Sequence, residues 1–516
     1  MGLTPAPVEA WYLAWVALVP LWILIIKNNN LISFKKNILI ALAWGFGYHG
    51  LALFWITGIH PMTWMGVPWL ASIMIAIFCW LFITFWGATL VVIWSILISL
   101  YEKINFKITE TKKNIIRDSI LTNALLRVLI GVAIWCILEG IWSAGPLWWS
   151  SLSYTQSPHN LVILQLSKIS GFSTITASIV AVNGLIAEAI MAVISKHKNQ
   201  QNNKNIFFAF PLFFCIILHL LGWYLYNHTF TYIKDNALKI GIIQGNIPNE
   251  IKLYPAGWRK ALEGYTTGYK TLANQGVDVI LTPETALPFF WDYLVNNSSF
   301  YEAIIDKKVS AWVGAFGKQE RSFTNSLFTV TGKGKIFSEY DKIKLVPLGE
   351  YIPFEQILGR IINRLSPLDA HLAAGKPNQI FDTPFGRAIV GICYESAFSQ
   401  HFRRQAAQGG EFIITASNNA HYSNTMPAQH HAQDVMRAIE TDRWAARATN
   451  TGYSAIVDPR GKTIWISDIN TYELHTDTIY RRQTQTLYVK WGDWLTWFLL
   501  ILGLSSWLFI LSDTKN

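Results

Sequence analysis

Charged residues and cysteines are both scarce in this chain of 516 residues. Charged residues make up only 14% of the sequence and hydrophobic residues 52%, which excludes an ordinary soluble protein and is typical of a membrane protein. Of the 4 cysteines, Cys79, Cys136 and Cys215 fall within long apolar runs. Cys393 stands alone in the polar part of the chain, so a disulfide within that part is excluded, and its thiol is either buried and inert or kept for chemistry.

The sequence also lacks an internal repeat, an extended low-complexity tract and, over Met1–Ala10, the basic and apolar regions of a signal peptide. What it has is a series of apolar runs, most of them near the roughly 20 residues that a helix needs to cross the hydrocarbon core of a bilayer. These runs cover residues 11–26, 38–58, 64–100, 128–147, 172–195, 206–226 and 494–511. They predict a protein that crosses a membrane several times.

The distribution of basic residues predicts the orientation of these helices. The uncharged run 64–100 is long enough for one tilted helix or two short ones, and a single crossing places the basic loops at 27–36, 103–117 and 196–204 on one side, as the positive-inside rule prefers. We therefore expect a bundle of about six spans in residues 1–235, an extracytoplasmic domain in 236–490 and a C-terminal membrane helix in 491–516. The N-terminus then lies outside without a leader, which suggests that a preceding helix is missing. These loops carry much of the net charge of +10, so we expect no nucleic-acid partner.

Residues 236–490 alternate between β-rich and helical segments. Strands are expected at 238–244, 277–281, 310–315, 327–331, 388–392, 411–415 and 453–457, and helices at 258–274, 396–408 and 429–448. Such alternation predicts an α/β layered domain rather than a β-sandwich or a barrel. In open α/β sheets ligands gather at the carboxyl ends of strands, so polar residues that follow apolar strands are the first candidates for a site.

Three residues are candidates for thiol acylation chemistry. Glu284 follows the strand at Val279–Leu281, Cys393 follows Ile389–Ile392, and Lys342 lies in a loop punctuated by proline and glycine. A carboxylate can take the thiol proton, and an ammonium group can stabilise the thiolate and the oxyanion of a tetrahedral intermediate. The sequence therefore predicts acyl transfer through a thioester.

The neighbours of these residues leave alternatives open. Glu350 and Glu395 are candidates to orient Lys342 or the incoming nucleophile, because a lysine held beside carboxylates stays protonated. Lys344 competes with Lys342 on spacing alone. Taken singly, each of these residue types is more often a surface or core residue than a catalytic one.

Two further sets of polar residues suggest rival functions. His430, His431 and Asp434 could be interpreted as metal ligands, but no Cys/His partner set at ligand spacing accompanies them, so we expect no metal site. Glu139 and Glu188 lie inside apolar runs and are candidates for a transport pathway. They lack a partnering set of Lys, Arg or Asp within the runs, so we rank a transporter well below an enzyme.

Several segments resemble the carbon–nitrogen hydrolase (nitrilase) superfamily, in which Glu, Lys and Cys follow one another in this order on an αββα sandwich. The segments are Ile243–Pro248, Pro283–Ala286, Tyr340–Pro353, Ile392–Glu395, Arg437–Glu440 and Thr449–Gly452, and in the apolar part Trp44–Gly47 and Gly145–Trp148. In detail they resemble the apolipoprotein N-acyltransferase branch, and the resemblance covers nearly the whole chain. It implies a multi-pass α-helical membrane domain joined to an α/β domain with the nitrilase-like αββα sandwich fold.

The resemblance also implies a reaction. A fatty acyl chain passes from a membrane phospholipid to Cys393 as a thioester, and then to the α-amino group of a diacylglyceryl-modified N-terminal cysteine on a lipoprotein. The general base of the family falls on Glu284 and its catalytic lysine on Lys342. Its supporting positions fall on Glu350, Tyr394 and Glu395. The implied enzyme lies in a bacterial inner membrane, faces the periplasm with its catalytic domain and needs no cofactor.

The chain departs from the family at Ser417–Tyr422, where the family usually has Ser-Asn-Asp-Ala-Trp-Phe and this chain has Ser-Asn-Asn-Ala-His-Tyr. Asn419, His421 and Tyr422 thus replace residues near the expected substrate pocket, which leaves the lipid preference open but not the three catalytic positions. The main alternative is a membrane-tethered amidase or nitrilase-type hydrolase that uses water as the acceptor. It shares every catalytic residue, so only the membrane helices and the family-specific segments speak against it.

Overall fold

The computed structural model describes residues 1–27, 31–111, 120–194, 204–228, 234–319, 322–351, 372–420 and 422–512. The chain divides into two compact units. The first consists of Met1–Phe54, Phe78–Thr229 and Trp491–Asn516, and the second of Trp55–Ile77 and Phe230–Lys490. Much of the basic loops expected at 103–117 and 196–204 lies outside the described residues, as does His421.

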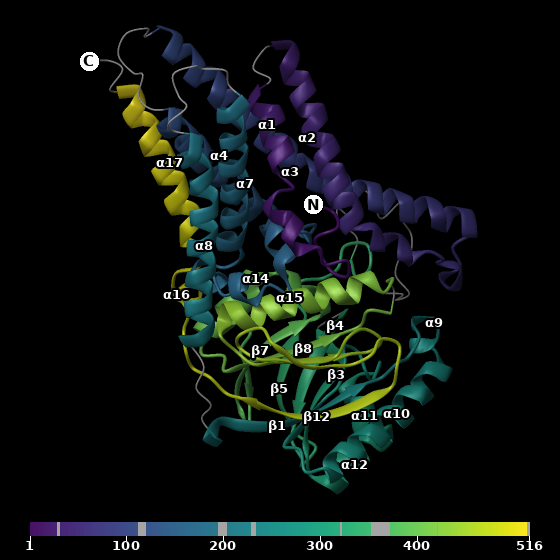
Figure 1. Cartoon of the computed structure of the whole chain (residues 1–516). Helices are drawn as coiled ribbons and strands as arrows, with labels where there is room; N and C mark the ends of the chain where they lie inside the picture. The colour runs from purple at the N-terminus through teal and green to yellow at the C-terminus, as the bar shows by residue number, and fades with distance from the viewer. Residues whose placement is uncertain are drawn as a thin grey trace. The chain divides into compact units, whose positions relative to one another are not determined.

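The first unit is helical (Figure 1). Its helices are α1 (Val19–Lys27), α2 (Leu31–Ala52), α3 (Trp69–Thr111, whose first turns belong to the second unit), α4 (Ile120–Ala144), α5 (Leu161–Leu164), α6 (Ser167–Ser170), α7 (Phe172–Ile194), α8 (Lys204–His228) and α17 (Trp494–Ser512), with the 3₁₀ turns η1 (Trp11–Trp15) and η4 (Leu152–Gln156). The run that could have been one or two helices thus forms one helix, α3. Within the described residues, four segments are long and apolar enough to cross a membrane, namely Trp69–Asn105, Leu121–Ala144, Phe172–Ile194 and Ala209–His228. The chain is therefore a membrane protein.

An ion-pair cluster inside this unit corrects one expectation. Arg127 of α4 donates to Glu102 and to Glu188, each at 2.7 Å, and Glu188 also accepts a hydrogen bond from Trp22 Nε1 at 3.1 Å. The expectation that Glu188 has no basic partner within the apolar segments is therefore wrong. Arg127 directly precedes the apolar run that begins at residue 128, but α4 already begins at Ile120, about two helical turns before that run.

The second unit contains two mixed sheets that pack face to face. One sheet has the order β12-β1-β2-β3-β4-β5 and the other β11-β10-β9-β8-β7-β6. The strands are β1 (Ala237–Gln244), β2 (Val279–Leu281), β3 (Ser310–Gln319), β4 (Ser322–Val330), β5 (Ile336–Asp341), β6 (Phe381–Thr383), β7 (Gly386–Ile392), β8 (Phe412–Ser417), β9 (Ala445–Thr449), β10 (Ala455–Val457), β11 (Thr463–Ile466) and β12 (Glu473–Tyr480). In each sheet three neighbouring strands are parallel, β1-β2-β3 and β7-β8-β9, and the outer ones are antiparallel.

Helices cover the outer face of each sheet, which gives the expected αββα sandwich. The helices are α9 (Asn249–Lys252), α10 (Pro255–Asn274), α11 (Trp291–Asn297), α12 (Ser299–Lys307), α14 (Ser399–Ala407), α15 (Thr425–Thr441) and α16 (Leu487–Trp491), with the 3₁₀ turns η2 (Phe54–Ile59), η3 (Thr63–Met65), η6 (Lys234–Asn236) and η7 (Cys393–Ala397). The helices α10, α11 and α12 lie against the sheet of β1–β3, and α14 and α15 against the sheet of β7–β10 (Figure 1).

Strand alternation builds two apolar layers. Ile240 and Trp312 point to the layer between the sheets, where they meet Val390 and Ile414 of the other sheet. Neighbouring positions of the first sheet, such as Ile280, point instead to the layer under α10 and α12. Because successive side chains of a strand face opposite ways, one strand supplies both layers.

One segment of the expected secondary structure is wrong. The helix expected over 429–448 ends at Thr441, and Ala445–Thr449 forms the central strand β9. Asp442, in the left-handed conformation, terminates the helix, and all five residues of β9 are buried between their neighbours in the sheet. The alanine-rich sequence favours a helix locally, but burial in the middle of a sheet overrides that preference.

Candidate active site

Glu284 lies at the carboxyl end of β2 and is buried. Its turn is tight, since Thr285 has a φ of +46°, a left-handed conformation that a β-branched residue rarely adopts. Gly314 of β3 permits this turn, because a Cβ there would lie 2.0 Å from the carbonyl oxygen of Pro283. Asn325 Nδ2 donates to Glu284 Oε1 at 2.7 Å, while Thr285 Oγ1 donates to Asn325 Oδ1 at 3.3 Å. The carboxylate is thus held in one orientation.

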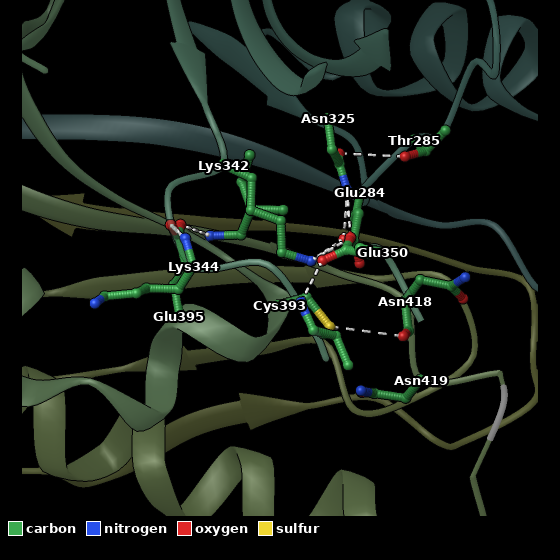
Figure 2. A network of polar contacts seen from close by, with 12 residues as sticks. Glu284, Thr285, Asn325, Lys342, Lys344, Glu350, Cys393, Glu395, Asn418 and Asn419 are labelled. Atoms are coloured by element: carbon green, nitrogen blue, oxygen red, sulfur yellow. Dashed lines mark hydrogen bonds and ion pairs between the residues drawn. The ribbon is translucent and has the colours of Figure 1, made fainter. Parts of the chain in front are cut away.

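The ammonium group of Lys342 lies between two carboxylates. Lys342 follows β5, and only 1% of its side chain is exposed. Its Nζ donates to Glu284 Oε1 at 2.9 Å and to Glu350 Oε1 at 2.8 Å. The second oxygen of Glu350 accepts from Val346 N at 2.8 Å. Figure 2 shows Asn325, Glu284 and Glu350 converging on the end of Lys342, with Cys393 beside them.

Burial and mutual attraction set the charges of this cluster. Burial alone would lower the pKa of Lys342, but Glu284 and Glu350 outweigh it and hold that pKa well above its usual value. Burial alone would raise the pKa of Glu284, but the Lys342 ammonium outweighs it and the pKa is lowered. For Glu350 burial prevails, aided by the charge of Glu284, and its pKa is raised. Glu284 is therefore the more acidic of the two carboxylates, and in its ionised form it can accept a proton.

The nucleophile candidate, Cys393, is strained and buried. It follows β7 with a φ of +52° and is 7% exposed. A non-glycine residue in this conformation costs about 1–3 kcal/mol, so its surroundings must hold it there. Its Sγ lies 3.7 Å from the carbonyl oxygen of Asn418. Burial, and then the charge of Glu284, raise the pKa of the Cys393 thiol to about 12, so the resting thiol is neutral and needs a base.

His430 holds the backbone of Cys393. Its Nε2 donates to the carbonyl oxygen of Cys393 at 2.7 Å, and its Nδ1 lies 3.2 Å from the amide nitrogen of Asn419. Burial lowers the pKa of His430 to about 3, so the ring is neutral. Because the Asn419 amide donates to Nδ1, the single ring proton remains on Nε2 for the Cys393 carbonyl. The departure from the family at position 419 is therefore part of the support of Cys393.

Glu395 ties the Lys342 loop to the strand that carries Cys393. Its Oε1 accepts from the backbone N–H groups of Ile343 and Lys344 at 2.7 and 3.0 Å, and its Oε2 accepts from Ile392 N at 2.8 Å. Glu395 is fully buried. It therefore acts on the backbone beside Lys342, whereas Glu350 binds the ammonium group itself.

The structure also separates the two lysine candidates. The Nζ of Lys344 lies 5.0 Å from the ring centroid of Phe398, away from the carboxylates that bind Lys342. Tyr394 packs edge to face on the same ring, with the centroids 5.1 Å apart. Tyr394 and Lys344 thus both support the turn after Cys393.

The residues that could have been interpreted as metal ligands are engaged in other contacts. His431 Nε2 lies 3.0 Å from Thr463 Oγ1, and Asp434 forms a buried ion pair with Arg447. With His430 on the Cys393 carbonyl, the three side chains serve the packing of α15. Among the described residues no group of three or more His, Cys, Asp or Glu side chains is placed to hold a metal ion.

A cavity of about 150 Å³ opens onto Glu284, Lys342 and Cys393. Its apolar wall consists of Trp64, Leu253, Phe316, Val346 and Leu372. Tyr422 also lines it and packs edge to face on Trp55, with the centroids 4.9 Å apart. Trp55 and Trp64 belong to the segment Trp55–Ile77, which groups with the second unit. Sequence reasoning did not assign this segment to the site, because it reads as part of the apolar runs.

Four polar residues of the cavity wall were also missed. They are Asn249, Lys252, Asn325 and Asn418. Asn418 follows the parallel strand β8, so the rule that selected Glu284 and Cys393 could have selected it too. Lys252 lies on the short helix α9 and Asn325 inside β4, positions at which a lysine or an asparagine carries no signal of its own.

Comparisons with known proteins cover nearly the whole chain. Residues 239–487 match the carbon-nitrogen hydrolase family, and residues 1–185 match the apolipoprotein N-acyltransferase N-terminal domain. A Nostoc protein named apolipoprotein N-acyltransferase is 57% identical over 513 residues, which cover 98% of this chain and 97% of that protein. A Synechocystis protein of the same name is 48% identical over 520 residues, 99% of this chain and 98% of that protein.

Among solved structures, an amidase from Nesterenkonia sp. is similar with a TM-score of 0.37 and 16% identity. The matched region covers 50% of this chain and 95% of the amidase. A likeness of this size supports no inference about activity. The assignment therefore depends on the family matches and on the near full-length relatives.

Proposed function

The chain belongs to the apolipoprotein N-acyltransferase family, and from this membership we propose that it moves a fatty acyl chain from a membrane phospholipid to a lipoprotein. The acceptor is the α-amino group of the diacylglyceryl-modified N-terminal cysteine. Glu284, Lys342 and Cys393 carry the reaction. The observation that carries this assignment is their convergence in one cavity, with Lys342 2.9 Å from Glu284.

In the first half-reaction Cys393 is acylated. Glu284 takes the thiol proton as the sulfur attacks the ester carbonyl carbon of the phospholipid, and Lys342 stabilises the oxyanion that forms. The bond between the carbonyl carbon and the glycerol oxygen then breaks. Glu284 returns its proton to that oxygen, and lysophospholipid leaves.

In the second half-reaction the lipoprotein amine takes the acyl group. Its nitrogen attacks the thioester carbonyl as the free amine, and Glu284 receives the proton that the nitrogen loses. The carbon–sulfur bond breaks, and the thiolate of Cys393 regains a proton from Glu284. The products are the amide and the free enzyme. Glu284 thus acts as the base in both half-reactions.

A two-stage labelling experiment tests this proposal. The purified enzyme is incubated with phospholipid that carries a labelled acyl chain, and a diacylglyceryl-modified lipopeptide is added afterwards. We expect label on the enzyme in the first stage and on the lipopeptide in the second. Release of the label as free fatty acid before the lipopeptide is added would support the hydrolase alternative instead.

The proposed topology places six membrane crossings in residues 1–235, the catalytic domain 236–490 on the extracytoplasmic side and one further crossing in 491–516. The basic loops support this orientation. Alkaline phosphatase fused after residue 235 should be active, and a fusion between residues 104 and 118 should be inactive. The reverse pattern of activity would show that the catalytic domain lies on the cytoplasmic side.

A further inference from the structure

The cavity holds a cation, Lys252, that forms no ion pair with a carboxylate of the described residues. Lys252 is 6% exposed and lines the cavity with Cys393. Its Nζ donates to the main-chain carbonyl oxygen of Glu284 at 3.0 Å, the one hydrogen bond that it forms among the described residues. By contrast, Lys342 in the same cavity is bound by two carboxylates. An ammonium group has three N–H donors, so two donors of Lys252 are left for a ligand.

A second unused donor lies one helical turn away. Asn249 is 7% exposed, lies on α9 with Lys252 and lines the same cavity. Its Oδ1 accepts from Asn418 Nδ2 at 3.0 Å, but its Nδ2 has no hydrogen-bond partner in the part of the chain that the structure describes. A buried amide nitrogen without a partner costs about 1–3 kcal/mol, so it is an unusual feature unless a ligand completes it.

The orientation of this amide is fixed by a chain of hydrogen bonds. Ile247 N donates to Asn450 Oδ1 at 2.9 Å, and Asn450 Nδ2 donates to the Ile247 carbonyl oxygen at 2.7 Å. Asn450 Nδ2 therefore also faces Asn418 Oδ1, at 3.0 Å. Asn418 must then donate to Asn249 through its Nδ2. Each amide can point only one way, so the free end of Asn249 is its NH₂ group.

The helix that carries both donors is held in place. Gly257 at the start of α10 packs against α9 so closely that a Cβ there would lie 2.0 Å from the carbonyl oxygen of Ile251. Asn249 and Lys252 are thus presented by a fixed backbone rather than by long surface side chains. The result is a preformed group of donors with a positive charge, which fits an anionic oxygen ligand.

We propose that Lys252 and Asn249 bind a phosphodiester oxygen of the phospholipid acyl donor. This inference rests on the proposed function, in which the ester carbonyl of the donor sits at Cys393. The phosphodiester is separated from that ester only by the glycerol backbone, so it is the anion that the donor brings to this cavity. The subsite therefore recognises the donor by its phosphate and places its ester at the thiol.

The experiment compares two acyl donors that differ in the phosphate. Single-turnover acylation of Cys393 is measured with dipalmitoyl phosphatidylglycerol and with p-nitrophenyl palmitate, which has the same acyl chain and no phosphate. Lys252→Met should lower kcat/KM for the phospholipid by about 10- to 100-fold, which is the usual loss when a hydrogen bond to a charged group is removed. The same variant should lower kcat/KM for the p-nitrophenyl ester by less than about threefold.

Three further variants make the comparison specific. Asn249→Asp, which replaces the unused donor by a negative charge, should also impair the phospholipid selectively. Lys252→Arg should recover most of the activity, since it retains the charge. Lys270→Met, which removes an exposed lysine of α10, is the matched control and should leave both donors unaffected.

Each outcome decides the matter. Equal losses with the two donors would show that Lys252 only supports the Glu284 segment, and would overturn the proposal, as would no loss with either. Slower transfer from the preformed thioester to the lipopeptide would assign Lys252 to the acceptor and also overturn it. If the wild-type enzyme forms no thioester with either donor, the proposed function itself fails.

Discussion

Replacing Glu350 by glutamine tests how the Lys342 ammonium is held. The carboxylate of Glu350 accepts two hydrogen bonds at 2.8 Å, one from Lys342 Nζ and one from Val346 N. A glutamine side chain has one oxygen and one NH₂ group, so it can accept only one of them. In Glu350→Gln, the new NH₂ group therefore faces either Lys342 Nζ or Val346 N, both of which are donors. The substitution also removes the negative charge beside Lys342.

The expected loss follows from these contacts. An unsatisfied buried donor costs about 1–3 kcal/mol, which corresponds to roughly 5- to 150-fold in rate if it is felt in the transition state. Lys342 would also pair with Glu284 alone, which lowers the pKa of Glu284 further and makes it a weaker base. Acylation should slow within this range. The acidic limb of kcat/KM should move to lower pH, because the base stays ionised in more acidic solution.

Single-turnover acylation by labelled phospholipid measures both effects. Glu263→Gln, which makes the same charge change on the exposed face of α10, serves as the control. A merely structural defect would slow the reaction without moving the acidic limb. Acylation at the wild-type rate with an unshifted limb would refute the role given to Glu350.

Three more predictions concern the remaining groups of the site. Lys342→Ala should slow acylation by about 10²–10³-fold, the usual loss on removing a preorganised oxyanion donor, as measured by thioester formation without acceptor. His430→Phe should lower kcat of acylation by about tenfold with little change in KM, because the Cys393 carbonyl loses its partner. Burial lowers the pKa of Lys252 to about 8, so kcat/KM for phospholipid should fall as the pH rises through 8 and the amine loses its charge. The groups around that amine are Glu284, Cys393 and Lys342, none of which titrates near this pH, and Lys252→Arg should remove the basic limb.

The position of polar residues at the ends of strands identified two of the three candidate catalytic residues. Glu284 and Cys393 both follow buried parallel strands, and the sequence marks such strands by short apolar runs bounded by polar residues. Lys342 follows the antiparallel strand β5, whose sequence is half polar and gave no strand signal, so its choice over Lys344 needed the family resemblance. The αββα architecture was likewise implied by the family rather than by periodicity.

Other features could not be predicted because they depend on tertiary contacts. The free NH₂ group of Asn249 exists only because Asn450 and Asn418 fix the direction of each amide. The partner of Glu188 was missed because Arg127 lies just outside the apolar run, although it lies inside the helix. Strand β9 was missed because its alanines favour a helix until the neighbouring strands bury them.

The most direct test of the thioester mechanism is mass spectrometry of the enzyme after incubation with phospholipid alone. We predict one acyl adduct, released by hydroxylamine and mapped to the peptide that contains Cys393, the one cysteine outside the long apolar runs. Cys393→Ser should insert into the membrane normally, form no such adduct and transfer no acyl chain. An adduct on another residue, or wild-type transfer by Cys393→Ser, would contradict the mechanism.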